Sequence, residues 1–190
     1  MPNVMLRNRE GKGFADVTTA SGLGHLQKGH GVAFADMDGD GDQDVAIRMG
    51  GAYPGDGYRC GLFANPGNHN HWLKLRLIGD QSNSFGVGAR IRIDLREGAA
   101  TRSVYRTVGT GGSFGCKPMR QELGLGHSDH IERLVVWWPA SGIRSVYKGV
   151  GLNTSIEISE GATTFKPVPI RTMKLGMDPI AGLPPSHRGQ

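Results

Sequence analysis

Short segments in which apolar and polar residues alternate recur along the chain, and they restrict its fold more than any other feature. In segment 72–78 leucines alternate with Lys74 and Arg76, and in segment 89–94 Ile91 and Ile93 alternate with arginines. A period of two residues over such short runs predicts half-buried antiparallel strands. By this pattern strands are expected at 4–7, 32–35, 45–49, 62–64, 72–78, 89–94, 103–108, 121–125, 133–137, 144–148 and 155–158.

Glycine-rich connections separate these segments, and the chain contains 31 glycines in 190 residues. Many short strands joined by such turns predict a mainly β fold, namely an antiparallel sandwich or a barrel-like domain with a blade-like segment before it. One short helical turn is expected at 17–22, with Asp16 or Thr18 as its N-cap and Gly22 at its end.

An internal similarity indicates how the chain is divided. Segments 4–8 and 61–65 both read as a short strand ending in Asn, which suits one four-stranded blade and the start of a second. An isolated blade cannot bury both faces of its sheet, so this part should pack on the C-terminal module or belong to a longer array. We expect a blade-like segment at 1–68, a β domain at 69–164 and an extended, proline-rich tail at 165–190.

Charge and hydropathy limit the partners. The longest apolar run, 134–138, is far shorter than the roughly 20 residues of a membrane-spanning helix, so no such helix is expected. The first residues lack the residue order of a signal peptide. Five of the 17 acidic residues lie between Asp36 and Asp44, which leaves a net charge of +10 on the rest of the chain. A basic surface favours an anionic polysaccharide, a lipid surface or an acidic protein, whereas singly spaced Lys and Arg disfavour nucleic acid.

The sequence DMDGDGDQD, between two apolar strands, is the strongest chemical signal. Its carboxylates at alternating positions converge when the chain curls, Gly41 permits a sharp turn, and Asp44 can close the shell. Oxygen ligands in a flexible loop suit calcium, and without a cation these carboxylates would repel one another. A solvated acidic turn and a magnesium site are the alternatives. An EF-hand is excluded because Ile47 stands where that loop needs Glu.

Several motifs in fixed order resemble known families. The segment NVMLRNREGKGFADVTTASGL, with GVAFADMDGDGDQDVAI after it, resembles an FG-GAP/VCBS repeat, the calcium-loop blade of integrin-type propellers. GNHNHWLKLRLIG, SNSFGVGARIRI, YRTVGTGGSFGCKPMRQELGLG and IERLVVWWPASG resemble the ASPIC/UnbV domain of the cartilage acidic protein family and its bacterial relatives. The resemblance implies a secreted or periplasmic β protein that binds Ca²⁺. The ligands it implies are Asp36, Asp38, Asp40, Asp42 through its carbonyl, and Asp44.

Other candidate sites have less support from the sequence. Segment 111–115 matches the G-x-S-x-G pattern of hydrolases around Ser113, with Asp129 and His130 further on, but Pro118 follows where that motif needs a helix. His69 and His71 lack an evident third metal ligand, which favours a structural role. Trp137 and Trp138 would lie on opposite faces of a strand, so at least one of them is expected in the core.

Cys60 and Cys116 are the two cysteines of the chain. A disulfide between them would tie the blade-like segment to the C-terminal module in an oxidising compartment, and two free thiols are the alternative.

These observations and the resemblance favour a non-enzymatic, extracytoplasmic calcium-binding interaction module that docks on a larger protein partner or surface. The first alternative is a structural subunit of a multiprotein or filamentous assembly, whose neighbours complete the blade-like segment. A hydrolase using Ser113 is the weakest alternative.

Overall fold

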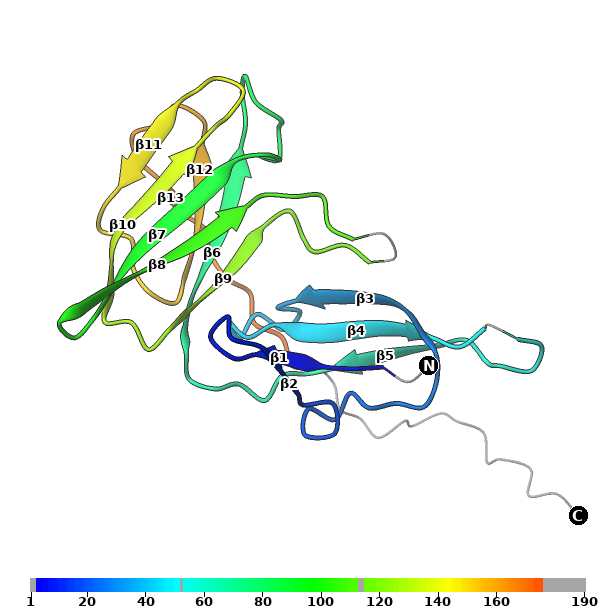
Figure 1. The fold of residues 1–190 in the computed structure, drawn as a ribbon. Coiled ribbons are helices and arrows are strands. Elements are labelled where there is room, and N and C mark those ends of the chain that lie inside the picture. The colour runs from blue at the N-terminus through cyan, green and yellow to red at the C-terminus, as the bar shows by residue number, and fades with distance from the viewer. Residues whose placement is uncertain (1–2, 52, 113–114, 176–190) are drawn as a thin grey trace, which may run out of the picture.

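The computed structural model describes residues 3–51, 53–112 and 115–175 (Figure 1). All regular structure within these ranges is β, which confirms the expected fold class. None of the described residues forms a helix that could cross a membrane.

The C-terminal part is a sandwich of two four-stranded sheets (Figure 1). The first sheet has the order β11 (Arg144–Tyr147), β10 (His130–Trp137), β7 (Arg90–Glu97) and β8 (Ala100–Thr107). The second sheet has the order β13 (Lys166–Pro167), β12 (Thr154–Ser159), β6 (His71–Ile78) and β9 (Gln121–Gly126). Both sheets are open, so the described residues form a sandwich rather than a barrel.

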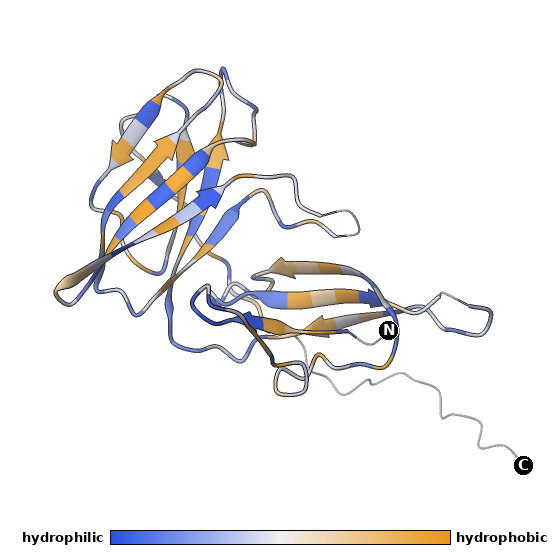
Figure 2. Cartoon of the chain, in the orientation of Figure 1, coloured by the Kyte–Doolittle hydropathy of each residue, from blue (hydrophilic) through white to orange (hydrophobic). Residues whose placement is uncertain are grey.

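The alternation seen in the sequence explains the core between these sheets, and Figure 2 shows it as alternating colours along the strands. Leu73 and Leu75 of β6 meet Ile91 and Ile93 of β7 in one buried cluster. Trp138 is also fully buried in this cluster, whereas Trp137 stays partly exposed, as the alternation predicts. Apolar side chains on one face of each strand therefore account for the stability of the sandwich.

One pairing differs from the expected antiparallel arrangement. Strands β6 and β12 are parallel, with Leu75 opposite Ile156 and Leu77 opposite Ile158. A parallel pair needs a long crossover, and here the chain passes through β7 to β11 before it returns. Periodicity locates strands but does not determine their direction.

The N-terminal region (residues 3–68) contains two small sheets. Strands β3 (Gly29–Ala35), β4 (Asp44–Met49) and β5 (Arg59–Phe63) form an antiparallel sheet, and β1 (Leu6–Asn8) pairs with β2 (Phe14–Asp16) as a separate ribbon. The expected four-stranded blade is therefore split. Met5, just before β1, packs against the small core of Leu23, Val45, Ile47 and Met49, whereas the ribbon itself stays largely exposed.

All the strands expected from the alternation are present, whereas two short ones were not expected. Strand β2 has three residues, and β13 has two, one of them Pro167. Both are too short for a periodic signal, and proline is disfavoured in strands. The expected helix at 17–22 is a single turn, in which the Ser21 N–H donates to the Val17 carbonyl at 2.8 Å.

The described part of the proline-rich tail, 165–175, runs along the body of the protein. After β13, the Val168 N–H donates to the Ser155 carbonyl at 2.8 Å. Further on, the Met173 N–H donates to the Asp38 carbonyl at 2.7 Å. The tail thus runs from the sandwich back to the acidic loop of the N-terminal region.

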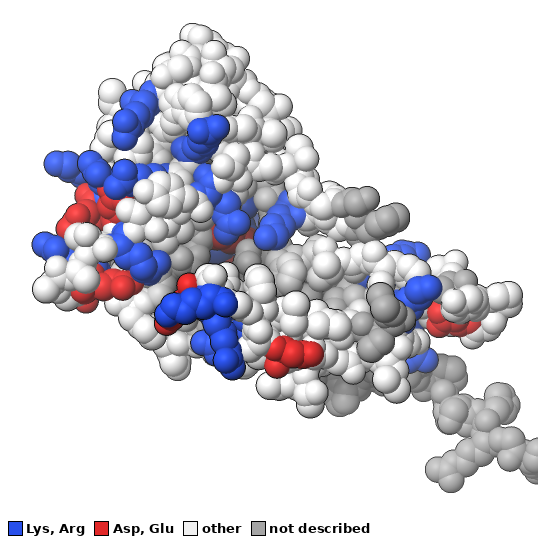
Figure 3. All heavy atoms as spheres, viewed as in Figure 1, with Lys and Arg blue, Asp and Glu red and all other residues white. Residues whose placement is uncertain are grey.

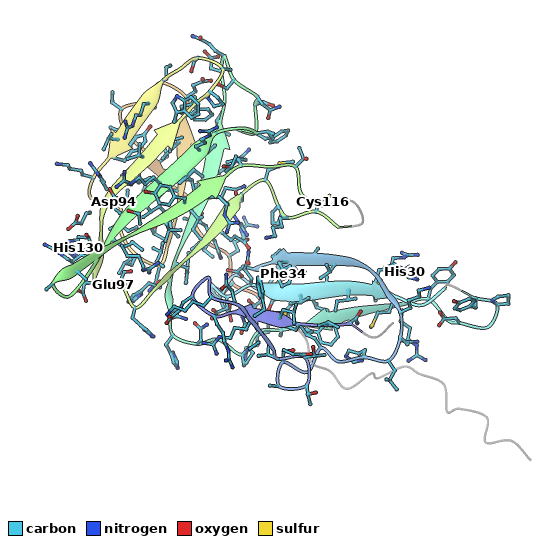
Figure 4. All side chains as sticks on the ribbon, viewed as in Figure 1. His30, Phe34, Asp94, Glu97, Cys116 and His130 are labelled. Carbon is cyan, nitrogen blue, oxygen red and sulfur yellow. The ribbon has the colours of Figure 1, made fainter. Side chains whose placement is uncertain are left out.

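The outer face of the first sheet contains a buried carboxylate, Asp94 of β7, labelled in Figure 4. Ser103 and Arg92 donate to its Oδ1 at 2.6 and 2.7 Å, and Arg133 donates to its Oδ2. Burial opposes ionisation of Asp94, but these hydrogen bonds outweigh it and lower its pKa to about 2 from 3.8. The ionised carboxylate therefore stabilises the fold at neutral pH.

This cluster predicts a pH dependence. Because the pKa of Asp94 is lower in the folded chain, its contribution is complete above about pH 4 and is lost as the pH falls toward 2. We expect Asp94→Asn to be less stable than the wild type at neutral pH by about 1–3 kcal/mol, and this difference to shrink between pH 4 and pH 2. Urea unfolding across this range measures it. A difference in unfolding free energy that stays constant with pH would contradict a lowered pKa of Asp94 in the folded chain.

Candidate metal centre

The acidic loop joins β3 to β4, at the end of the N-terminal sheet that faces the sandwich (Figure 1). β3 and β4 pair as far as Ala35 and Asp44. The chain between these residues is therefore a closed loop with fixed ends.

Three of the predicted ligands come together. Asp36, Asp38 and Asp40 each offer a carboxylate oxygen, and these oxygens lie within 4.8 Å of one another. Asx-type hydrogen bonds shape the loop: Asp38 accepts from the Asp40 N–H at 3.2 Å, and Asp40 accepts from the Asp42 N–H at 2.9 Å. The loop thus gathers negative charge around one point.

The other two predicted ligands lie differently. The buried carboxylate of Asp44 accepts from the Met37 N–H and the Asn65 N–H, both at 2.9 Å, so it ties the loop to the segment after β5. The Asp42 carboxylate lies beside Gly67 and accepts a backbone hydrogen bond from Asn68. Neither belongs to the group of three carboxylates. The prediction that they are ligands therefore stays a prediction.

Burial and charge repulsion raise the pKa of two carboxyl groups in the loop. Burial raises the pKa of Asp38, and the neighbouring carboxylates of Asp40, Asp44 and Asp36 raise it further. The pKa of Asp42 is raised for the same reasons. Raised pKa values mean that the folded loop disfavours its own ionised form, which a bound cation would correct.

Asp36 connects this loop to the sandwich. Its Oδ1 accepts from the Gly39 N–H at 2.6 Å, and its Oδ2 accepts from the Gly41 N–H at 2.8 Å and pairs with the Lys74 ammonium of β6. The side chains of Asp36 and Lys74 are only 1% and 3% exposed. The Lys74 ammonium also lies 4.6 Å from the centre of the Trp72 ring. A buried ion pair therefore spans the contact between the two parts of the chain.

Glu122 of β9 makes a second connection. Its Oε2 accepts from the Asp36 N–H at 3.0 Å and from the Gln43 side chain at 2.9 Å. Arg120 donates to its Oε1 at 2.6 Å. A cavity of about 220 Å³ opens beside this contact, lined by residues of both parts, including Asp42, His71 and Arg106.

The donor set fits a hard cation. A carboxylate has about four lone-pair positions, and Asp36 uses three of them on Gly39, Gly41 and Lys74, which leaves one for a metal. Asp38 and Asp40 each accept a backbone bond within the loop and retain further positions. Carboxylate oxygens with free positions in a flexible loop are the ligands that calcium takes.

Gly41 gives a testable contact. It has a φ of +107°, and a Cβ there would collide with the Trp72 indole, so Gly41→Ala should both strain the backbone and displace the loop. Gly55→Ala is the matched control, because Gly55 has a φ of +88° and open space around it. We expect strain of about 1–3 kcal/mol in both variants and a clearly larger loss of unfolding free energy in Gly41→Ala. Equal losses in urea unfolding would contradict the packing of this loop on Trp72.

The remaining candidates are not assembled into a site by the described residues. Ser113 lies outside the described residues. Asp129 and His130 follow β9, whereas Cys116 precedes it. Figure 4 labels Cys116 and His130 far apart on the two sides of that strand. His71 contacts Asn153 at 3.0 Å, and His69, with a φ of +60°, lies in the preceding loop.

Cys60 and Cys116 are free, exposed thiols in this structure. Gly115, beside Cys116, shares a groove of about 210 Å³ with Cys60 of β5, so the segment before β9 passes near the N-terminal sheet that contains Cys60. A bridge in oxidised protein stays a prediction, which alkylation and mass spectrometry of non-reduced protein would test.

Comparison with known families finds a match within the sandwich. Residues 79–165 match the family model for ASPIC and UnbV. This ASPIC/UnbV domain begins directly after β6 and contains β7 to β12, so its partner strand β6 and the whole acidic loop lie outside the matched residues. A search of curated proteins finds no match to the chain.

Sequence reasoning missed the residues that attach the loop to the sandwich. Lys74 was expected on the exposed face of its strand, and it is buried because the acidic loop covers that face. Glu122 lies 86 residues from Asp36, and no local pattern links them. The one available signal was Lys74 itself, a cation two residues after Trp72 in a strand whose other face is made of leucines.

Proposed function

We propose that this chain is a non-enzymatic calcium-binding interaction module, acting outside the cytoplasm, that docks on a larger protein partner. The observation that carries the proposal is the convergence of the Asp36, Asp38 and Asp40 carboxylates within 4.8 Å, where the N-terminal region meets the sandwich. Calcium, when bound, supplies the positive charge that lets these groups lie together. The resemblance of the region to an FG-GAP/VCBS repeat supports the same ligand and an extracytoplasmic location.

The proposed role of the ion is to order a junction. The loop contacts Lys74 of β6, Glu122 of β9 and the tail near Met173, three segments that are far apart in the sequence. An ordered loop therefore holds the N-terminal sheet in one orientation on the ASPIC/UnbV domain. Loss of the ion would release that orientation before it unfolds the sandwich core.

The N-terminal sheet supplies the docking surface in this proposal. A largely apolar groove of about 290 Å³ runs beside β3, lined by residues that include Met5, Leu23, Val32 and Phe34. Val32 remains 49% exposed although it lies on the side of the sheet that carries the small core. Exposed apolar side chains next to an unpaired strand edge suit addition of a strand from a protein partner.

Cross-linking in native extract tests calcium-dependent docking. With calcium present, we expect cross-links from Lys12 and Lys28 of the N-terminal region to one other protein, and we expect chelation to remove them. Lys148, at the far side of the sandwich, serves as the internal control. Cross-links that survive chelation, or that form from Lys148 alone, would contradict the proposal.

A structural subunit is the second candidate, and the edges of the N-terminal sheet favour it. Within the described residues, β3 and β5 each pair with β4 alone, so this sheet has two open edges. Open edges allow neighbouring copies to continue a sheet. Light scattering of the purified, calcium-loaded chain distinguishes the candidates: growth of assemblies with concentration supports a self-assembling subunit, and a monodisperse monomer supports docking on a different protein.

A further inference from the structure

The outer face of the sheet β11-β10-β7-β8 is rich in arginine. Strand β7 directs alternate residues to this side, and β10 and β11 add further arginines. Figure 3 shows Lys and Arg gathered over this part of the molecule. We name as the arginine face the residues Arg90, Arg92, Arg96, Tyr105, Arg133, Trp137 and Arg144.

Basic and apolar residues alternate in these strands, which explains why this basic surface is not visible as a run of charges in the sequence. Arg90 and Arg92 are separated by a buried isoleucine, so no run of basic residues appears in the sequence. Pairing of the strands then places Trp137 directly opposite both Arg90 and Arg144. Cross-strand neighbours lie about 5 Å apart, so single arginines from three strands become one continuous patch.

Aromatic rings support two of these arginines. The Arg90 guanidinium lies 4.7 Å from the centre of the Trp137 ring, and that of Arg92 lies 5.7 Å from the centre of Tyr105. Stacking uses the flat face of a guanidinium, whereas its five N–H donors lie in its plane. Stacking thus holds both arginines in place. Arg92 also donates its Nε–H to Asp94, whereas Arg90 has no ion pair among the described residues, so its donors stay available to an anion.

The acidic groups of this face form ion pairs with some of its arginines and not with others. Asp94 binds Arg92 and Arg133, and Glu132 pairs with Arg96 at 3.4 Å. Among the described residues, neither Arg90 nor Arg144 has a carboxylate partner within ion-pair distance. The row Arg90, Trp137 and Arg144 is therefore the open, positively charged end of the arginine face.

We propose that the arginine face binds an acidic polysaccharide, with the row of Arg90, Trp137 and Arg144 as its central contact. Guanidinium forks recognise carboxylate and sulfate groups through paired hydrogen bonds. On the same face, Asp94 already accepts one Nε–H bond from each of Arg92 and Arg133, so these guanidinium groups do bind a carboxylate here. The partly exposed Trp137 indole beside these donors provides apolar contact for a sugar ring. This binding is independent of the proposed calcium site.

The charge pattern favours a polysaccharide over a nucleic acid. Duplex DNA carries one charge per about 1.7 Å of its axis, so phosphates laid on this sheet would also meet Asp94 and Glu132. A polysaccharide with an acidic group only on some sugars can place its anions on the open arginines and neutral sugars over the acidic groups. All five basic residues of the face are arginine, which fits planar anions better than lysine does.

The test uses the full chain in calcium-containing buffer and carboxymethyl-dextran, with unmodified dextran and duplex DNA as comparison ligands. We expect carboxymethyl-dextran to bind, dextran not to bind, and Arg90→Gln/Arg144→Gln to weaken binding about tenfold or more. The pair Arg7→Gln/Arg9→Gln removes the same charge from an exposed part of the N-terminal region and should change the affinity less than twofold. Arg144→Gln alone, on an edge strand, serves if the double variant has a lowered melting temperature.

Three results would overturn the proposal. They are no binding of carboxymethyl-dextran at low salt, an equal loss in both pairs of variants, and tighter binding of DNA than of the polysaccharide through the same arginines. Since the variants leave the acidic loop intact, calcium binding can persist or fail without affecting the outcome.

Discussion

Lys74→Met is expected to lower the free energy of unfolding by about 3–5 kcal/mol in calcium-free buffer. Lys74 and Asp36 are both buried, and removal of the ammonium leaves the Asp36 carboxylate without its cation in the protein interior. Breaking one half of a buried pair is costly because the other charge stays desolvated. Urea unfolding followed by tryptophan fluorescence measures the loss, and Trp72 beside Lys74 reports on the site itself.

Calcium should restore much of this loss of unfolding free energy, because the bound ion replaces the positive charge that Lys74 supplied to Asp36. The stabilisation by calcium should therefore be larger in Lys74→Met than in the wild type, and folding of the variant only with calcium would be the extreme form of this result. Lys148→Met, at an exposed lysine, is the matched control and should change the unfolding free energy little. A variant as stable as the wild type without calcium would contradict the role of the pair.

Removal of calcium from the wild type should also have a large effect. A ligand that binds only the folded state stabilises it by about 2.7 kcal/mol at a concentration of 100 Kd and by about 4.1 kcal/mol at 1,000 Kd. For a chain of this size, this corresponds to a fall in Tm on the order of 10 °C when a chelator replaces excess calcium. Differential scanning calorimetry measures it.

Magnesium at the same concentration is the control for ion type. It demands a rigid octahedral site and keeps its own waters, so a flexible carboxylate loop should gain less from it. An equal shift with both ions would favour the magnesium alternative, and equal Tm values with calcium and with chelator would rule out a stabilising metal site.

The sequence predicted the strands well because their signal is local. Alternation in 72–78 and 89–94 specifies which side chains enter the core, and Leu73, Leu75, Ile91 and Ile93 are buried accordingly. The acidic loop was also readable, since its glycines and alternating carboxylates lie within nine residues. Features set by a few neighbouring residues are available from a single sequence.

The contacts across the fold were not predictable in this way. Lys74 looked like an exposed residue because its strand alternates, and only the packing of the acidic loop on β6 buries it. The parallel pairing of β6 with β12 and the bond from Glu122 to Asp36 likewise join residues separated by about 80 positions or more. Such pairings depend on topology, which periodicity does not specify.

The arginine face was only partly predictable from the sequence. The basic charge predicted an anionic partner, and the single spacing of Lys and Arg was interpreted only as evidence against nucleic acid. Strand geometry then collects the alternate arginines on one side of a sheet. Their spacing was visible in the sequence, but their alignment across three strands required the register of β7, β10 and β11.

Calorimetric titration of the calcium-stripped chain with calcium tests the central claim most directly. The wild type should bind a single ion, and Asp38→Asn/Asp40→Asn should lose that binding while keeping the sandwich folded, because both side chains lie in the loop outside the core. No binding by the wild type, or unchanged binding by the variant, would contradict a calcium centre formed by Asp36, Asp38 and Asp40.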